Sequence, residues 1–214
     1  MVEKNRIDLL KEIGSIKKCE LIILTTFSFD PLFFDHMVLK ELRKGNPYAK
    51  IVVLADSNHV DVESRTDLTG LDYRMITIPS TFHPKMFIFC GPDETISFIG
   101  SHNITLAGFS HNLELTCKIK DQDLSLQCLD CIRSVLLKFL ANEDPLLTDI
   151  KRQMSGKTYL KKYGEIHFIH NMESNILDQV ISLIKESNLD VKEVKIISPF
   201  YSQVRSLAKK IRLK

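Results

Sequence analysis

The sequence predicts an α/β fold in which a β-sheet is covered by helices. Short apolar runs of strand length alternate along the chain with segments whose apolar residues recur every three or four positions. This alternation is typical of layered α/β domains. The 214 residues are enough for one such domain with a hydrophobic core and part of another.

Local signals place the helices and strands of the first unit. Asp30 and Pro31 predict the start of a helix, and Gly45 predicts its end. Pro145 predicts the end of the last helix. In chain order we expect a helix at 6–18, a strand at 20–27, a helix at 30–45, strands at 49–56, 73–78, 85–90, 95–100 and 113–119, and a helix at 123–142.

The C-terminal part of the chain resembles its beginning. Residues 175–211 have the pattern helix, strand, helix, as residues 6–42 do, and aligning Glu193 with Glu20 places "ISPF" on "LTTF". The alternative is that one helix-strand-helix pattern resembles another by chance. As an internal repeat, it predicts three parts: a complete catalytic half at 1–145, a basic linker at 146–164, and a truncated second half at 165–214.

Composition excludes several classes of protein. Apolar residues make up 44% of the chain and charged residues 26%, which fits neither a disordered nor a fibrous protein. The apolar runs are too short to span a membrane, and the N-terminus lacks a signal peptide's apolar core. Five scattered cysteines indicate a reducing compartment, so we expect a cytoplasmic protein. The net charge of +2 does not indicate nucleic-acid binding, although 151–163 and 205–214 are locally basic.

Polar residues cluster where two of the predicted strands begin or end. His83 and Lys85 are two residues apart at the start of one strand, so they project from the same face. Ser101 and Asn103 follow the next strand, where Gly100 allows close approach of a ligand to the backbone. Sites in open α/β sheets collect at such strand ends.

The strand at 113–119 adds a carboxylate. Alternation places Leu113 and Leu115 on one face and Glu114 on the other. An acidic residue on a buried strand needs a partner, and the imidazole of His83 is the expected one.

Together these residues suit cleavage of a phosphodiester without a metal. The reaction needs an uncharged nucleophile, and groups that bind the phosphoryl oxygens. A neutral His83 serves as the nucleophile and forms a phosphohistidine, while Glu114 fixes its tautomer. Lys85, Ser101 and Asn103 bind phosphoryl oxygens. A second histidine is expected as the acid, which requires another copy of the site.

These motifs resemble the signature of the phospholipase D superfamily, His-x-Lys followed by Gly-Ser-x-Asn. Here they are His83-Pro84-Lys85 and Gly100-Ser101-His102-Asn103, with Cys90 where most members have Asp. Glu on the following strand resembles the nuclease branch, which includes metal-independent restriction endonucleases and helicase-associated nuclease domains. The resemblance covers roughly residues 18–142.

The resemblance implies a mixed sheet flanked by helices on both faces, and a homodimer or a second half that completes the site. It implies catalytic roles for His83, Lys85, Ser101, Asn103 and Glu114, with Gly100 and His102 joining the substrate-binding set. We expect a DNA nuclease of a restriction or defence system, without cofactor, metal or membrane contact, and associated with a helicase. Lipid or small phosphodiesters remain alternative substrates. An inactive nucleic-acid-binding or scaffolding module is the alternative from another class.

Other motifs have plainer explanations. Cys128 and Cys131 have metal-ligand spacing but lie in an amphipathic helix, and His167 to His170 do not complete a zinc site. Asp121 to Asp123 are typical of a helix N-cap. The motifs of NTP hydrolysis, α/β-hydrolase chemistry and dinucleotide binding are absent from the sequence.

Overall fold

The computed structural model describes residues 8–60, 72–79, 81–156, 169 and 176–186. The chain divides into two compact units, Met1–Ile166 and His167–Lys214. In the second unit the described element is helix α6 (Ile176–Glu186). The strand and second helix expected at 187–211 lie outside the described residues, so the internal repeat stays a prediction.

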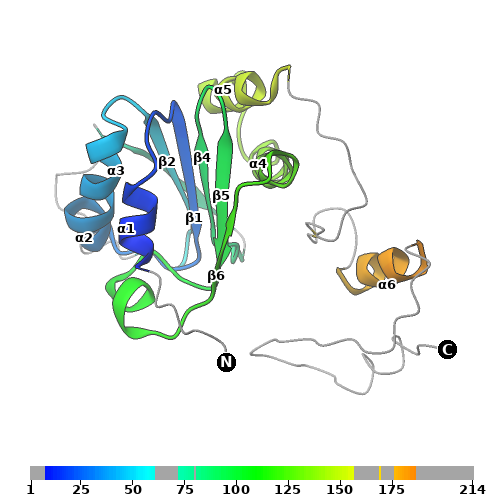
Figure 1. Cartoon of the computed structure of the whole chain (residues 1–214), viewed down its shortest axis with the longest axis horizontal. Coiled ribbons are helices and arrows are strands. Elements are labelled where there is room, and N and C mark those ends of the chain that lie inside the picture. The colour runs from blue at the N-terminus through cyan, green and yellow to red at the C-terminus, as the bar shows by residue number, and fades with distance from the viewer. Residues whose placement is uncertain (1–7, 61–71, 80, 157–168, 170–175, 187–214) are drawn as a thin grey trace. The chain divides into compact units, whose positions relative to one another are not determined.

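One mixed β-sheet forms the centre of the first unit (Figure 1). The strand order is β3-β2-β1-β4-β5-β6. The first three strands run parallel, and β4, β5 and β6 are each antiparallel to the neighbour before them in that order. The strands are β1 (Leu21–Thr26), β2 (Lys50–Asp56), β3 (Arg74–Ile78), β4 (Met86–Cys90), β5 (Thr95–Gly100) and β6 (Thr116–Ile119).

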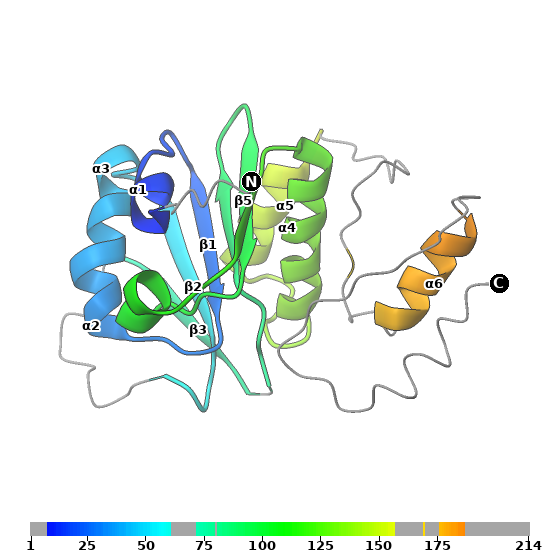
Figure 2. The same cartoon turned by 60° about the horizontal axis from the view of Figure 1, so that its bottom comes forward.

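Helices cover both faces of this sheet (Figures 1 and 2). One face carries α1 (Leu9–Gly14) and the continuous segment α2 (Pro31–Phe33), η1 (Phe34–Leu39) and α3 (Lys40–Gly45); the other carries α4 (Gln122–Leu136) and α5 (Pro145–Met154). The side chains of Asp30 and Asp121 accept hydrogen bonds at the starts of α2 and α4, as the sequence predicts. No helix of the described residues has the length and apolarity needed to cross a membrane.

Burial is greatest in the middle of the sheet. Every residue of β1 and β4 is buried, which explains why both read as continuous apolar runs rather than alternating ones. On the α1–α3 side, Phe29, Phe34 and Phe87 lie in one apolar cluster. This rigid centre sets the positions of the loops at both ends of the strands.

The helix expected at 123–142 ends earlier, at Leu136, and two further elements differ from the sequence prediction. The strand expected at 113–119 starts at Thr116, and it is an edge strand with exposed residues rather than a buried one. Leu113 and Leu115 are 103% and 79% exposed. The first part of the expected linker forms helix α5, because Asp144 caps it and Leu147 and Ile150 pack inward.

Candidate active site

The candidate site lies at one end of the central strands of the sheet. The carboxyl end of β1 pairs with β2 in parallel, so both strands end there. Because β4 runs antiparallel to β1, and β5 to β4, the start of β4 and the end of β5 lie beside the carboxyl end of β1. The topology thereby brings together the two motifs that the sequence analysis singled out.

His83 and Lys85 lie immediately before β4 and touch each other. Nζ of Lys85 is 3.1 Å from Nδ1 and 3.4 Å from Nε2 of His83, and it donates to the carbonyl oxygen of His83 at 3.1 Å. The Lys85 residue is buried, whereas His83 is exposed. The lysine therefore places a cation directly beside an imidazole that solvent and substrate can reach.

Electrostatics favour the neutral form of His83. Partial burial and the positive charge of Lys85 both lower the pKa of His83 below its ordinary value. Burial also lowers the pKa of Lys85, while the carboxylate of Glu114 acts in the opposite direction and favours the charged ammonium. A neutral imidazole beside a cation is the state that a nucleophile attacking an anionic phosphodiester requires.

Thr25, which the sequence analysis did not single out, holds this motif in place. Its buried hydroxyl donates to the carbonyl oxygen of Pro84 at 3.0 Å and accepts from the backbone N–H of Met86 at 2.8 Å. These two bonds join the end of β1 to both sides of Lys85. The signal in the sequence was weak, since a Thr at the end of an apolar strand has many ordinary explanations.

Asn103 is fixed through its oxygen. Oδ1 accepts from the backbone N–H of Ser28 at 3.2 Å and lies 3.5 Å from Oγ1 of Thr26. Thr26 in turn accepts from the backbone N–H of Ile104 at 3.0 Å, which ties the loop after β5 to β1. This arrangement leaves the amide nitrogen of Asn103 as the donor that can face a ligand.

Ser101 and Glu114 form a pair next to this loop. The hydroxyl of Ser101 donates to Glu114 and accepts from the backbone N–H of Leu115 at 3.0 Å. Asn112 donates to the other oxygen of Glu114 at 3.2 Å. The predicted hydrogen bond between Glu114 and His83 is not among the contacts of the described residues, and Glu114 is not on a buried strand. Its carboxylate instead orients Ser101 and acts on Lys85 through its charge.

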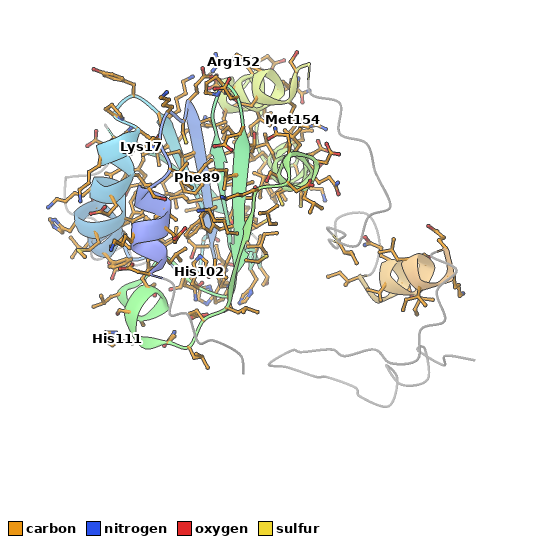
Figure 3. The ribbon with its side chains drawn as sticks, viewed as in Figure 1. Lys17, Phe89, His102, His111, Arg152 and Met154 are labelled. Atoms are coloured by element: carbon orange, nitrogen blue, oxygen red, sulfur yellow. The ribbon has the colours of Figure 1, made fainter. Side chains whose placement is uncertain are left out.

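His102, which the resemblance places in the substrate-binding set, is buried. Its side chain is 1% exposed, close to Phe87, and its Nδ1 lies 3.1 Å from Oγ1 of Thr116. Figure 3 shows it near the lower end of the sheet, whereas His111 lies on the helical turn η2 (Ala107–His111). Burial lowers the pKa of His102 to about 4, so this residue is a neutral part of the core.

Gly100 explains how His102 turns inward. A Cβ at this position would stand 2.6 Å from Nδ1 of His102 and 2.7 Å from the carbonyl oxygen of Leu115. The backbone N–H of Gly100 already donates to the carbonyl oxygen of Lys85 at 3.0 Å. The glycine is therefore needed for close packing of the two motifs, and its proposed contact with substrate stays a prediction.

The metal-site alternatives receive no support from the described residues. Cys128 and Cys131 are buried within α4, and burial raises the pKa of Cys128 to about 12. No group of three or more His, Cys, Asp or Glu side chains suited to a metal ion occurs in the part of the chain that the structure describes. His167 and His170 lie outside it.

Comparisons with curated proteins and with solved structures give different results. The comparison with curated proteins finds no match. Among solved structures, NucT from Helicobacter pylori is 16% identical with a TM-score of 0.45, and the match covers 60% of this chain and 85% of that one. Nuc from Salmonella typhimurium, a phospholipase D family member, is 15% identical with a TM-score of 0.42 and the same two coverages. Yeast tyrosyl-DNA phosphodiesterase is 20% identical with a TM-score of 0.42, covering 65% of this chain and 35% of that one.

A family model supplies the assignment. The model described as "Cardiolipin synthase, PLD-like domain" matches residues 11–135, more than half of the chain. That range contains the sheet and both motifs, from His83 and Lys85 to Ser101 and Asn103. The chain thus belongs to the phospholipase D superfamily, through its PLD-like domain of the cardiolipin synthase type.

Proposed function

We propose that this chain supplies one catalytic half of a metal-independent phosphodiesterase that cleaves DNA, with His83 as the nucleophile. The observation that carries the proposal is the buried ammonium of Lys85, 3.1 Å from the ring of an exposed His83 whose pKa is lowered. A buried lysine placed against an accessible imidazole is costly for stability alone, and it suits binding of an anion at the histidine.

The residues divide the reaction between them. A ring nitrogen of His83 attacks phosphorus, so that an N–P bond forms as the bond to the leaving oxygen breaks. Lys85 and the amide nitrogen of Asn103 bind the non-bridging oxygens, and Ser101, whose hydroxyl donates to Glu114, orients the loop that carries Asn103. Water then attacks the phosphohistidine, the N–P bond breaks, and the imidazole is restored.

The leaving oxygen needs a proton from a second acid. We assign this role to a second phospholipase D-like half, contributed by another copy of the chain or by sequence beyond Lys214. Three exposed leucines support the proposal that a second half covers the surface beside the site: Leu106, Leu113 and Leu115. Exposed apolar side chains close in sequence to the polar residues of a site are typical of a surface that a partner buries.

The choice of DNA rests on the pairing of Ser101 with Glu114. The order His-x-Lys, Ser-x-Asn and then a Glu resembles the nuclease branch of the superfamily, and in this structure that Glu holds that Ser. The buried Cys90 in place of the usual Asp departs from the lipid-cleaving members. Association with a helicase and a role in defence extend this proposal and depend on the same test.

Cleavage in excess EDTA tests the proposal. Single- and double-stranded DNA and bis(p-nitrophenyl) phosphate are incubated with the full protein, with His83→Ala, and with His36→Ala as a matched control, since His36 is an exposed histidine on η1. We expect DNA cleavage by the parent and the control, and loss of at least a hundredfold in His83→Ala.

Three results would redirect the proposal. Cleavage of DNA by His83→Ala at the parental rate excludes His83 as nucleophile. Hydrolysis of the small phosphodiester without DNA cleavage keeps the chemistry and changes the substrate class. Binding of DNA by the parent and by His83→Ala alike, with no turnover of either substrate, favours the scaffolding alternative.

A further inference from the structure

A second histidine, His59, contacts the same phenylalanine as His83 at this end of the strands. Phe27 follows β1, His59 lies in the turn after β2, and His83 precedes β4. The ring centroids of Phe27 and His59 are 3.9 Å apart, and those of Phe27 and His83 are 4.6 Å apart. The two imidazoles therefore share one aromatic ring as a common support, and the proposed reaction gives His59 no task.

The buried carboxylate of Asp56 connects the two histidines. Asp56 is 1% exposed, and its Oδ1 lies 3.1 Å from Nδ1 of His59 and accepts from the backbone N–H of Asn58 at 2.9 Å. Its Oδ2 accepts from the backbone N–H of Phe82 at 2.8 Å, directly before His83. One carboxylate thus fixes the ring of His59 and the segment that carries His83.

Asp56 is held as an anion. Burial opposes its ionisation, but the hydrogen bonds from Phe82, His59 and Asn58 outweigh burial and lower the pKa of Asp56. An anionic carboxylate at Nδ1 makes that nitrogen the donor of the pair and fixes the orientation of the His59 ring. The other ring nitrogen, Nε2, belongs to a side chain that is 45% exposed, and it carries an N–H donor when the ring is protonated on both nitrogens.

The backbone of His59 is also fixed. Its N–H donates to the carbonyl oxygen of Asp56 at 3.2 Å, and its carbonyl oxygen accepts from the backbone N–H of Phe29 at 3.1 Å. An ordinary surface histidine has no such constraint on its backbone, its ring face and one ring nitrogen together. Within the part of the chain that the structure describes, no hydrogen bond involves the remaining nitrogen, Nε2, so this nitrogen is available to a ligand.

We propose that His59 is a phosphate-binding residue of this site, positioned by Asp56, and that its Nε2–H donates to an oxygen of the phosphodiester that His83 attacks. This inference rests on the proposed function for the identity of the substrate, but phosphate binding does not require turnover. The residue adds a donor on the β2 side of the site, whereas Ser101 and Asn103 follow β5. Asp56 is a positioning residue, because it acts through His59.

Binding of inorganic phosphate tests the inference without any need for catalysis. The full protein labelled with ¹⁵N-histidine is titrated with phosphate and followed by NMR of the ring nitrogens, for the parent, His59→Gln and the control His36→Gln. We expect phosphate to shift the ring signals of both His59 and His83. We expect His59→Gln to weaken binding roughly tenfold, because a charge-assisted hydrogen bond is lost, and His36→Gln to bind as the parent does.

A second variant separates a binding role from a structural one. Asp56→Asn removes the anion and replaces one accepting oxygen with an NH2 group, so we expect weaker phosphate binding, with the His83 signals still dispersed as in a folded protein. In DNA cleavage, His59→Gln should raise KM more than it lowers kcat.

The outcomes distinguish this inference from the proposed function. Phosphate binding through His59 in a protein that cleaves no DNA would support the inference and contradict the proposed nuclease function. Parental phosphate affinity in His59→Gln, or unchanged His59 signals at saturating phosphate, overturns the inference even if DNA is cleaved.

Discussion

Thr25→Val removes the hydroxyl that joins β1 to the segment of His83 and Lys85 and keeps nearly the same shape. In the parent, this hydroxyl donates to the carbonyl oxygen of Pro84 and accepts from the N–H of Met86. Thr25 and Met86 are buried, so water cannot replace the lost partner of the Met86 N–H. The substitution therefore leaves at least one buried backbone donor without a partner.

The expected cost follows from that count. One buried donor left unpaired costs about 1–3 kcal/mol, and the half-buried carbonyl of Pro84 adds less because solvent reaches it in part. The additional methyl group of valine recovers a fraction of this free energy, since it needs no hydrogen-bond partner. We expect the free energy of unfolding to fall by about 2 kcal/mol, and kcat/KM to fall because the backbone on both sides of Lys85 loses its anchor.

Urea unfolding measures the effect with two matched variants. Thr25→Ser keeps the hydroxyl and should lose less than Thr25→Val, although the serine lacks the methyl group. Thr77→Val makes the same change at an exposed position of β3, where we expect a change within about 0.5 kcal/mol. A Thr25→Val protein as stable as the parent, or less affected than Thr25→Ser, would refute the role given to these two hydrogen bonds.

Three further substitutions follow from the same geometry. Gly100→Ala should lower the free energy of unfolding by about 1–3 kcal/mol in urea titrations, because its Cβ would meet His102 and a backbone oxygen, and an unchanged stability would contradict this packing. His102 has a folded-state pKa of about 4, below its ordinary 6.5, so its contribution to the free energy of unfolding is complete above pH 6.5 and is lost as pH falls toward 4. Over that window, the free energy of unfolding of the parent should fall by about 3 kcal/mol more than that of His102→Leu. Lys85→Met should raise the pKa of His83 in an NMR titration, because the ammonium that disfavours the imidazolium is gone, and a fall would show that Lys85 does not set it.

The central elements of the fold could be predicted because their signals are local. The continuous apolar runs that become β1 and β4 are buried on both faces, and the Asp-Pro pair at residue 30 begins the helical segment as expected. The edge strand could not be predicted in the same way. Alternation of leucines with polar residues is the same for a strand buried on one face and for the exposed approach to β6, where Leu113 and Leu115 face solvent.

The helix at the start of the expected linker could not be predicted for a related reason. Proline can follow the end of one helix, but it is equally suited to the first turn of a new one, and here Asp144 caps that turn. Basic residues such as Lys151 and Arg152 gave the segment a linker-like composition. The apolar residues that decide its fate, Leu147 and Ile150, are few in number but lie on one face.

The residues of the candidate site that form spaced motifs could be predicted from the sequence. Those that lie outside such motifs could not. His83 and Lys85 come together because they are two residues apart before one strand. Asp56 and His59 reach the same place only because β2 pairs in parallel with β1, a long-range contact that local sequence does not encode. The burial of His102 could not be predicted either, because its inward turn depends on the space left by Gly100.

Trapping the covalent intermediate tests the central claim most directly. The full protein is mixed with DNA in excess EDTA, quenched in alkali, where phosphohistidine survives, digested, and analysed by mass spectrometry. The account predicts a nucleotide adduct on the peptide that carries His83, present in the parent and in His36→Ala and absent in His83→Ala. DNA cleavage with the adduct on another residue, or cleavage that continues in His83→Ala, would contradict it.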